Sequence, residues 1–551
     1  MTRRDRVPPR SSALARAALR LAGAAGPAAI ILLLLLHAGC ADRPPEGPGA
    51  GPSLPVRFPL PADPVTLDAA RAVDTTSFAV ARLIGDSLVA FDAHLELVPR
   101  VARSWSWSED HRALTFSLRP DVRWHDGRPV TADDVVHTWR VLTAPDAPPD
   151  KAVAFNLVES VEAPTPETVV VRYRTPFAPA LGAWTHPLLP AHRTEREPPL
   201  GCGPWIFERW DPGERVVLRA NPDYYGGAPR APELLLEVLR DYQTRFAALE
   251  AGRIDAAPLL PDTWRSVKED PAFRARFEVR EYRQLYFFYV AWRMDGSNPW
   301  FADARVRRAM TLAIDRAGYL EKVAPGFGRP AVTSIHPDHW CFDGSLAPLP
   351  YDPRAASALL AEAGFRDADG DGVLERGGVP FSFRLTISQS SKENERIAAF
   401  IQDHLRRVGV AVELEPLEWA VFQERLRGDR FEAVMLGRSL DPDPDPYDLW
   451  HSTQAEGGVN YAGLEDPDVD RWIEAARGTF DRGERVRLYH LLQARLHELQ
   501  PDTFFFYPDS RLAVSRELSG LETSPLGVLA FWPGPFAWER RAAAASPAAA
   551  R

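Results

Sequence analysis

The sequence lacks the short motifs that mark the common hydrolases, nucleotide-binding proteins and thiol redox proteins. It has no Gly-x-Ser-x-Gly elbow, no phosphate-binding P-loop, no His-Glu-x-x-His pair and no Cys-x-x-Cys pair. His336 and His339 lie three positions apart around a proline, with no third ligand evident, and we interpret them as loop histidines. We therefore predict no catalytic residue, no cofactor and no bound metal.

Cysteine is scarce, with three in 551 residues. The first of them, Cys40, follows a leader with six arginines and an apolar run that ends in Ile30–Leu36. This order is typical of a secretory signal peptide. The apolar run falls short of the roughly 20 residues that a membrane-spanning helix needs, although a retained helix is the alternative. We predict that residues 1–39 are a signal peptide.

The other two cysteines, Cys202 and Cys341, are an even pair in a chain expected to reach an oxidising compartment. They either form a disulfide or stand as two buried small residues, because sequence spacing does not show whether two cysteines meet.

The residues around Cys40 indicate that the chain is anchored to a membrane, and its two ends have compositions typical of a stalk and a tail. Ala38-Gly39-Cys40 resembles the lipobox of bacterial lipoproteins, with His37 where that motif usually has leucine. The resemblance implies lipidation of Cys40 and anchoring to the cell membrane, outside the cytoplasm. Residues 40–54 are rich in proline and glycine and predict a stalk, and residues 541–551 predict a disordered tail.

The charge balance excludes one large class of partner. The chain has a net charge of −10, and removal of the arginine-rich leader makes the mature part more negative still. A surface of that sign repels phosphates, so we expect no nucleic acid partner. The charge says little about a small ligand, because one pocket can differ in sign from the whole surface.

Hydrophobic periodicity predicts an α/β protein of more than one domain, since the chain exceeds the size of a single core. Strands are expected at 114–119 and 168–173, and a hairpin at 205–219 around Asp211-Pro212-Gly213. Further helices are expected at 242–251, 303–316, 353–363, 393–408, 466–479 and 484–500. Further strands are expected at 381–387, 410–417, 431–436 and 503–507.

A series of motifs then occurs in a characteristic order. They are Leu97–Trp105, Trp124–Val135, Gly201–Trp205, Asn221–Tyr225, Asp303–Arg316 and Tyr351–Phe365. In this order they resemble the dipeptide/oligopeptide-binding type, family 5, of extracellular solute-binding proteins, which deliver ligands to ABC importers. The resemblance covers residues 55–535. Within these motifs, the sequence His125-Asp126-Gly127 indicates a turn and not a catalytic pair.

The resemblance implies a two-lobed, periplasmic-binding-protein-like (type II) fold with an extra subdomain and mixed sheets flanked by helices. Lobe I would comprise 55–96, 198–283 and 505–540, with 97–197 as its added subdomain, and lobe II would comprise 284–504. Such a protein encloses its ligand by hinge closure. The implied partners are a peptide or other small molecule, the permease subunits of an ABC transporter and the membrane, with the binder itself a monomer.

The ligand site is expected around Asp441–Trp450, where three aspartates alternate with three prolines. Each proline fixes its own φ and keeps the preceding aspartate extended, so the carboxylates are held close together. A ligand ammonium would relieve their repulsion. In peptide-binding members of the family an aspartate of the corresponding segment pairs with the peptide amine, and Asp441 and Asp443 are both candidates here. An acidic surface turn is the alternative.

Other site residues are predicted less directly. Trp419 and Trp450 are candidates for the walls of the ligand cleft, with core packing as the alternative. Arg438 is a candidate only because it lies nearby in sequence. Asp367–Gly372 resembles the start of a calcium loop, but Gly378 replaces the glutamate at position twelve, which favours a solvated turn.

Two other functions are compatible with parts of this pattern. The acidic stretch could serve an extracellular hydrolase as a carboxylate pair. The chain could also be a sensor ectodomain, or bind a non-peptide ligand such as a metal chelate or a sugar.

Overall fold

The computed structural model describes residues 53–193, 198–389 and 391–541. The predicted signal peptide, Cys40 and most of the predicted stalk lie outside the described residues, as does 542–551. Among the described residues, no helix has both the length and the hydrophobicity needed to span a bilayer.

The first sheet has four strands in the order β2 (Val56–Leu60), β11 (Glu233–Val238), β10 (Arg215–Ala220) and β9 (Trp205–Asp211). The β9–β10 hairpin confirms the predicted turn, where Gly213 takes a φ of +78°. Helix α3 (Thr75–Ile84) packs its apolar face on this sheet, within a core that includes Leu83 and Trp205. Asp74 caps α3 by accepting a hydrogen bond from the Ser77 amide.

The second sheet is antiparallel, in the order β5 (Ala102–Trp107), β6 (Ala113–Leu118), β8 (Thr168–Tyr173) and β7 (Val158–Thr165). Every second residue of β6 is buried, as its alternating sequence predicts. Helix α4 (Ala132–Leu142) contacts β7 and β8, and the Asp134 carboxylate accepts a hydrogen bond from the Thr131 amide at its start. The short α5 (Pro149–Val153) and η1 (Ala178–Thr185) complete this part of the chain.

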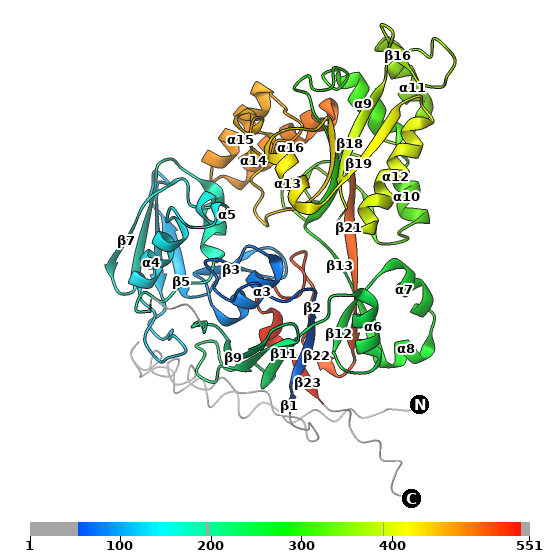
Figure 1. The fold of residues 1–551 in the computed structure, drawn as a ribbon. Helices are drawn as coiled ribbons and strands as arrows, with labels where there is room; N and C mark the ends of the chain where they lie inside the picture. The colour runs from blue at the N-terminus through cyan, green and yellow to red at the C-terminus, as the bar shows by residue number, and fades with distance from the viewer. Residues whose placement is uncertain (1–52, 194–197, 390, 542–551) are drawn as a thin grey trace, which may run out of the picture. The chain divides into compact units, whose positions relative to one another are not determined.

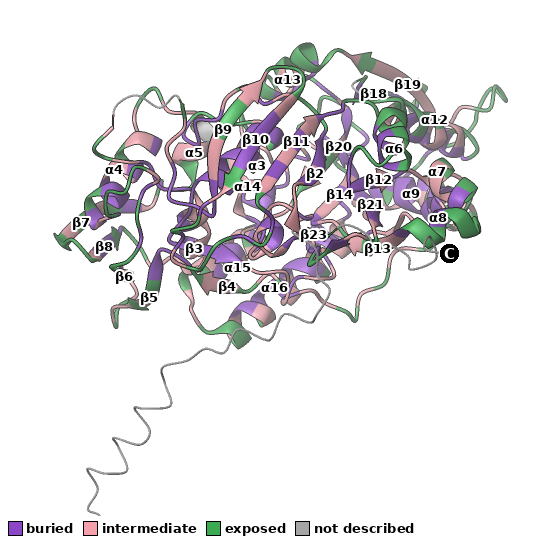
Figure 2. Ribbon diagram, turned by 90° about the horizontal axis from the view of Figure 1, so that it is seen from below, coloured by how far each residue is buried: buried purple, intermediate pink, exposed green. Residues whose placement is uncertain are grey.

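The largest sheet has eight strands. Its main path is β12 (Ala256–Leu259), β21 (Asp502–Ser515), β14 (Tyr286–Trp292), β20 (Ala433–Ser439), β18 (Ser382–Ser388) and β19 (Ala411–Leu417), and β13 (Phe277–Arg283) and β15 (Gly328–Pro330) also pair with β21. Strands β14 and β21 are mostly buried (Figure 2), whereas β19 and most of β13 are partly exposed. Strand β21 pairs with β14 and β15 along one half and with β12 and β13 along the other.

Helices cover the large sheet through two separate cores. One core includes side chains of α9 (Ala304–Ala313), α10 (Arg316–Lys322), α11 (Pro353–Glu362) and α12 (Lys392–Arg406). The other includes α13 (Trp419–Arg427), α14 (Tyr447–Trp450), α15 (Pro467–Gly478) and α16 (Arg482–Leu499). Figure 1 shows α12 beside β19 and α13 to α16 as a separate group.

The remaining elements are short. They are β1 (Ser53–Leu54), β3 (Val89–Phe91), β4 (Leu97–Pro99), α6 (Tyr242–Glu250), α7 (Pro261–Val267), α8 (Pro271–Arg276), β16 (Glu375–Arg376), β17 (Val379–Pro380), η2 (Ser452–Gln454), β22 (Leu518–Ser519), η3 (Gly534–Ala537) and β23 (Glu539–Arg541).

The fold is therefore the predicted mixed α/β arrangement of sheets flanked by helices. The residues of the first and second sheets lie within the ranges expected for lobe I and its added subdomain. The large sheet contains residues of both expected lobes. Its strand β21 runs from residue 502 to 515 and so passes the expected border between lobe II and lobe I after residue 504. The described core forms one compact unit, so the exact division into lobes stays a prediction.

The suggested disulfide is wrong in this structure. Cys202 and Cys341 are both free thiols, and each is buried in a different core. Burial raises the pKa of both thiols, so they stay protonated at neutral pH. They are the two buried small residues of the alternative interpretation.

Candidate functional site

A cavity of about 400 Å³ lies where four distant stretches of chain meet, the last of them contributing Leu526 and Ala530. One wall comes from α3 and β3, a second from η1, and a third from the acidic segment that follows β20. Its lining residues are Phe78, Arg82, Phe91, Ala154, Phe177, Pro179, Gly182, Ala183, Thr185, Leu440, Asp441, Pro442, Asp443, Asp445, Leu526 and Ala530. Three phenyl rings beside four charged side chains suit a small solute with both apolar and charged groups.

Helices α15 and α16 hold the acidic segment in place. Asp443 accepts hydrogen bonds from both terminal nitrogens of Arg485, at 2.9 and 3.3 Å. Asp445 pairs with Arg477, whose Nε lies 3.1 Å from its Oδ2. The Tyr489 hydroxyl also donates to a backbone carbonyl of the segment, at 2.7 Å. A segment fixed at several points presents its side chains to the cavity in one geometry.

Asp441 differs from the other two aspartates because its carboxylate is left without a partner. Its backbone carbonyl bonds to His339 Nε2 at 2.8 Å. Among the described residues, no side chain or amide donates to its carboxylate, which is exposed at the cavity. Desolvation raises its pKa, Arg438 opposes the rise, and the charges of Asp448 and Asp443 add to it. A carboxylate in this setting favours a cationic ligand group.

Contacts around the cavity join the stretch 477–482 to the N-terminal half of the chain. The Arg477 guanidinium lies 5.0 Å from the centre of the Phe177 ring. Phe480 stacks on His111 at 4.2 Å and meets Trp107 at 4.7 Å. The first of these contacts joins Arg477, the partner of Asp445, to Phe177 in the cavity lining.

The two predicted tryptophans do not line this cavity, and their contact with a ligand stays a prediction. Trp450 is 1% exposed in the core of α13 to α16, where its Nε1 donates to Ser334 Oγ at 2.8 Å. Trp419 is 53% exposed at the start of α13. Phe78, Phe91 and Phe177 form the apolar walls instead.

The predicted site residues with charged side chains have different outcomes. Asp441 and Asp443 both line the cavity, and their contact with a ligand stays a prediction. Arg438 is half-buried on β20 and does not line the cavity, although its positive charge acts to lower the pKa of Asp441. The cavity has a different cation, Arg82 on α3, which has no acidic partner among the described residues and which no motif in the sequence indicated.

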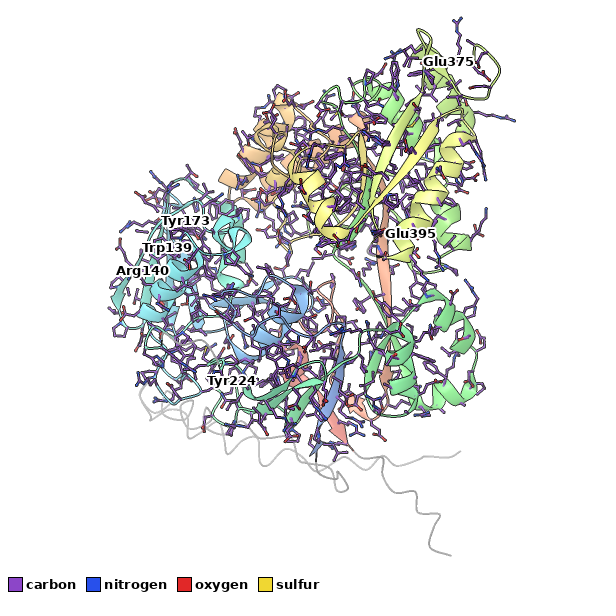
Figure 3. All side chains as sticks on the ribbon, viewed as in Figure 1. Trp139, Arg140, Tyr173, Tyr224, Glu375 and Glu395 are labelled. Carbon is purple, nitrogen blue, oxygen red and sulfur yellow. The ribbon has the colours of Figure 1, made fainter. Side chains whose placement is uncertain are left out.

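The sequence that resembles a calcium loop folds as an exposed acidic turn. Oxygens of Asp367, Asp369, Asp371 and Glu375 lie within 4.8 Å of one another. Each of these carboxylates accepts a hydrogen bond from a backbone amide of the same loop, at 2.7 to 3.1 Å. Glu375, the first residue of β16, is labelled in Figure 3. The prediction of no bound metal stays a prediction.

The cavity is lined by separate parts of one chain and suits a small solute. A family model described as bacterial extracellular solute-binding proteins, family 5, matches residues 96–460. The chain therefore belongs to this family of extracellular solute-binding proteins.

Curated relatives and solved structures agree with this assignment. The oligopeptide-binding protein AppA of Bacillus subtilis is 27% identical over 84% of this chain and 88% of its own length. Protein XP55 of Streptomyces lividans is 30% identical over 80% of this chain and 81% of its own. The structure of AppA with a nonapeptide superposes with a TM-score of 0.75 at 26% identity, covering 89% of this chain and all of that one.

A further solved structure with a similar fold has a different kind of ligand. NikZ from Campylobacter jejuni, in complex with Ni(L-His), has a TM-score of 0.76 at 25% identity and covers 89% of this chain and all of its own. The fold is thus shared by proteins whose ligands differ in chemistry.

Proposed function

We propose that this protein captures peptides or similar small amine-bearing ligands outside the cytoplasm and delivers them to an ABC importer, without chemical turnover. The observation that carries the proposal is the unpaired Asp441 carboxylate, on a rigid segment at a cavity with phenyl walls. The family of the chain and the similarity of the chain to AppA support a peptide as the ligand. Lipidation of Cys40, a monomeric state and closure of the chain around the ligand are parts of the same proposal.

The chemistry of the site supports an ammonium as the group that Asp441 binds. A ligand ammonium would supply hydrogen bonds to Asp441, the one carboxylate of the cavity lining that accepts none from the described residues. Asp443 is a weaker candidate, because Arg485 already occupies both of its oxygens. A metal chelate such as that of NikZ is a second candidate ligand.

A pool of synthetic tripeptides with free termini tests the proposal. We expect the purified protein to retain tripeptides with a free amine and to retain their N-acetylated forms at least tenfold less, since acetylation removes the positive charge. Mass spectrometry after ultrafiltration measures what is retained, and whether any peptide is cleaved. Equal retention of both forms would overturn the amine assignment, and retention of nickel–histidine alone would favour the chelate.

Binding of the tripeptide pool should weaken as the pH falls. Asp441 attracts an ammonium only when ionised, and because its pKa is raised above 3.8 it is protonated at a higher pH than an ordinary aspartate. Burial also raises the pKa of Asp445 to about 6, against the attraction of Arg477. Retention measured between about pH 4 and 8 should therefore fall toward the acid end, more steeply than in Asp441→Asn. Parallel curves for the two proteins would contradict the role of Asp441.

A further inference from the structure

Arg82 is a cation at the cavity wall with no acidic partner. It lies in the last turn of α3, one helical turn after Phe78, and both side chains line the cavity. Within 53–193, 198–389 and 391–541, no carboxylate lies within ion-pairing distance of its guanidinium. Its nearest aromatic neighbour is Phe78, whose ring centre lies 5.7 Å from the guanidinium carbon.

The acid nearest to it in sequence, Asp86, is already fully bonded. Its two oxygens accept hydrogen bonds from Arg100 at 3.2 and 3.0 Å. The hydroxyls of Tyr224 and Tyr225 donate to the same carboxylate at 2.8 and 2.9 Å. Asp86 therefore attracts Arg82 at a distance without serving as its partner. Burial is the larger effect and lowers the pKa of Arg82 to about 10, which leaves it charged at neutral pH.

The other two charged side chains of the cavity lining, Asp443 and Asp445, are each paired with an arginine of α15 or α16. Asp443 is paired with Arg485 and Asp445 with Arg477. What is left is one positive charge, Arg82, on the wall formed by α3 and one negative charge, Asp441, on the wall that follows β20.

We infer that Arg82 binds a carboxylate of the ligand while Asp441 binds its ammonium, so that the protein selects short zwitterions such as peptides of a few residues with a free C-terminus. This inference rests on the proposed function and adds the second anchor. A guanidinium offers paired donors that match the two oxygens of a carboxylate. A ligand with both charges would leave neither wall with an unpaired ion, whereas a simple amine would leave Arg82 without a partner.

The size of the cavity agrees with a short ligand. Its volume of about 400 Å³ lies near the lower end of the ~300–1,000 Å³ common for small-molecule sites. We therefore expect dipeptides and tripeptides to be retained in preference to long ones.

The tripeptide pool, prepared both as free acids and as C-terminal amides, tests Arg82 separately from Asp441. We expect the wild-type protein to retain free acids about tenfold or more over amides, which corresponds to about 1.4 kcal/mol. Arg82→Gln should reduce this preference to about one. Arg82→Lys, which keeps the charge, should retain part of it. The matched control is Arg140→Gln, an exposed arginine on α4 outside the cavity lining (Figure 3), which should leave the preference unchanged.

The outcomes separate this inference from the proposed function. Equal retention of acids and amides by the wild-type protein, or an unchanged preference in Arg82→Gln, overturns the role of Arg82. Failure of the wild-type protein to retain either pool overturns it as well. The proposed amine contact fails on a different result, equal retention of free and N-acetylated peptides. Thermal melts of each variant check that a lost preference does not reflect unfolding.

Discussion

Replacing Asp441 with asparagine should weaken binding of free-amine tripeptides by roughly thirtyfold, or about 2 kcal/mol. Asparagine keeps the shape of the side chain and removes the charge, so the ligand ammonium would be desolvated without a counter-ion. Because the segment is held by Arg485, Arg477 and Tyr489, the substitution should not change the backbone. Isothermal titration with one tripeptide recovered from the pool measures the effect.

A matched control lies in the same segment. Asp448 is near enough for its charge to raise the pKa of Asp441, yet it does not line the cavity. Asp448→Asn should therefore change affinity by only a few-fold. If Asp448→Asn weakened binding as much as Asp441→Asn, the effect would come from the overall charge of the segment and not from one contact.

The second large effect is on stability. Asp443→Ala should lower the free energy of unfolding by about 3 kcal/mol, because it leaves Arg485 without its partner. The side chains of this pair are 20% and 10% exposed, so little solvent is available to replace the lost contact. Denaturant unfolding of the unliganded protein measures the change.

A double variant shows whether the loss comes from the unpaired cation. Asp443→Ala with Arg485→Met should recover much of the lost stability, because no buried charge is then left without a partner. Asp262→Ala serves as the control, since its ion pair with Arg265 on α7 is mostly exposed and should contribute under about 1 kcal/mol. Additive losses in the double variant would contradict the explanation.

Local sequence patterns predicted most of the elements, because the relevant contacts are close in sequence. Strand 168–173 forms as expected, and the predicted helix 353–363 corresponds to α11. Strand β21 is the clear exception. We expected it to end at residue 507, where Pro508, Asp509 and Ser510 indicate a loop, but pairing with β13 and β12 extends it to 515. That extension depends on strands more than two hundred residues away.

The site was only partly predictable, for a related reason. The repeated Asp-Pro pattern located the acidic segment, but it could not show which aspartate has a partner. That depends on Arg485 and Arg477, which come from helices later in the chain. Arg82 gave no local signal at all, since its free charge depends on Asp86 being bonded by Arg100 and two tyrosines. The two tryptophans were candidates on side-chain type alone, and only the fold shows that Trp450 lies in a core whereas Trp419 is exposed.

Strand β21 also has a point at which two differently paired halves meet. Its first six residues are buried and its last residues are again mostly buried, but residues 508–511 between them are half-buried. At that point its neighbours change from β15 to β13, and Pro508 has no amide to donate to either. Bending of one half of β21 relative to the other would strain the strand at residues 508–511. Substitutions near Asp509, far from the cavity, should therefore alter how fast a ligand escapes without touching it.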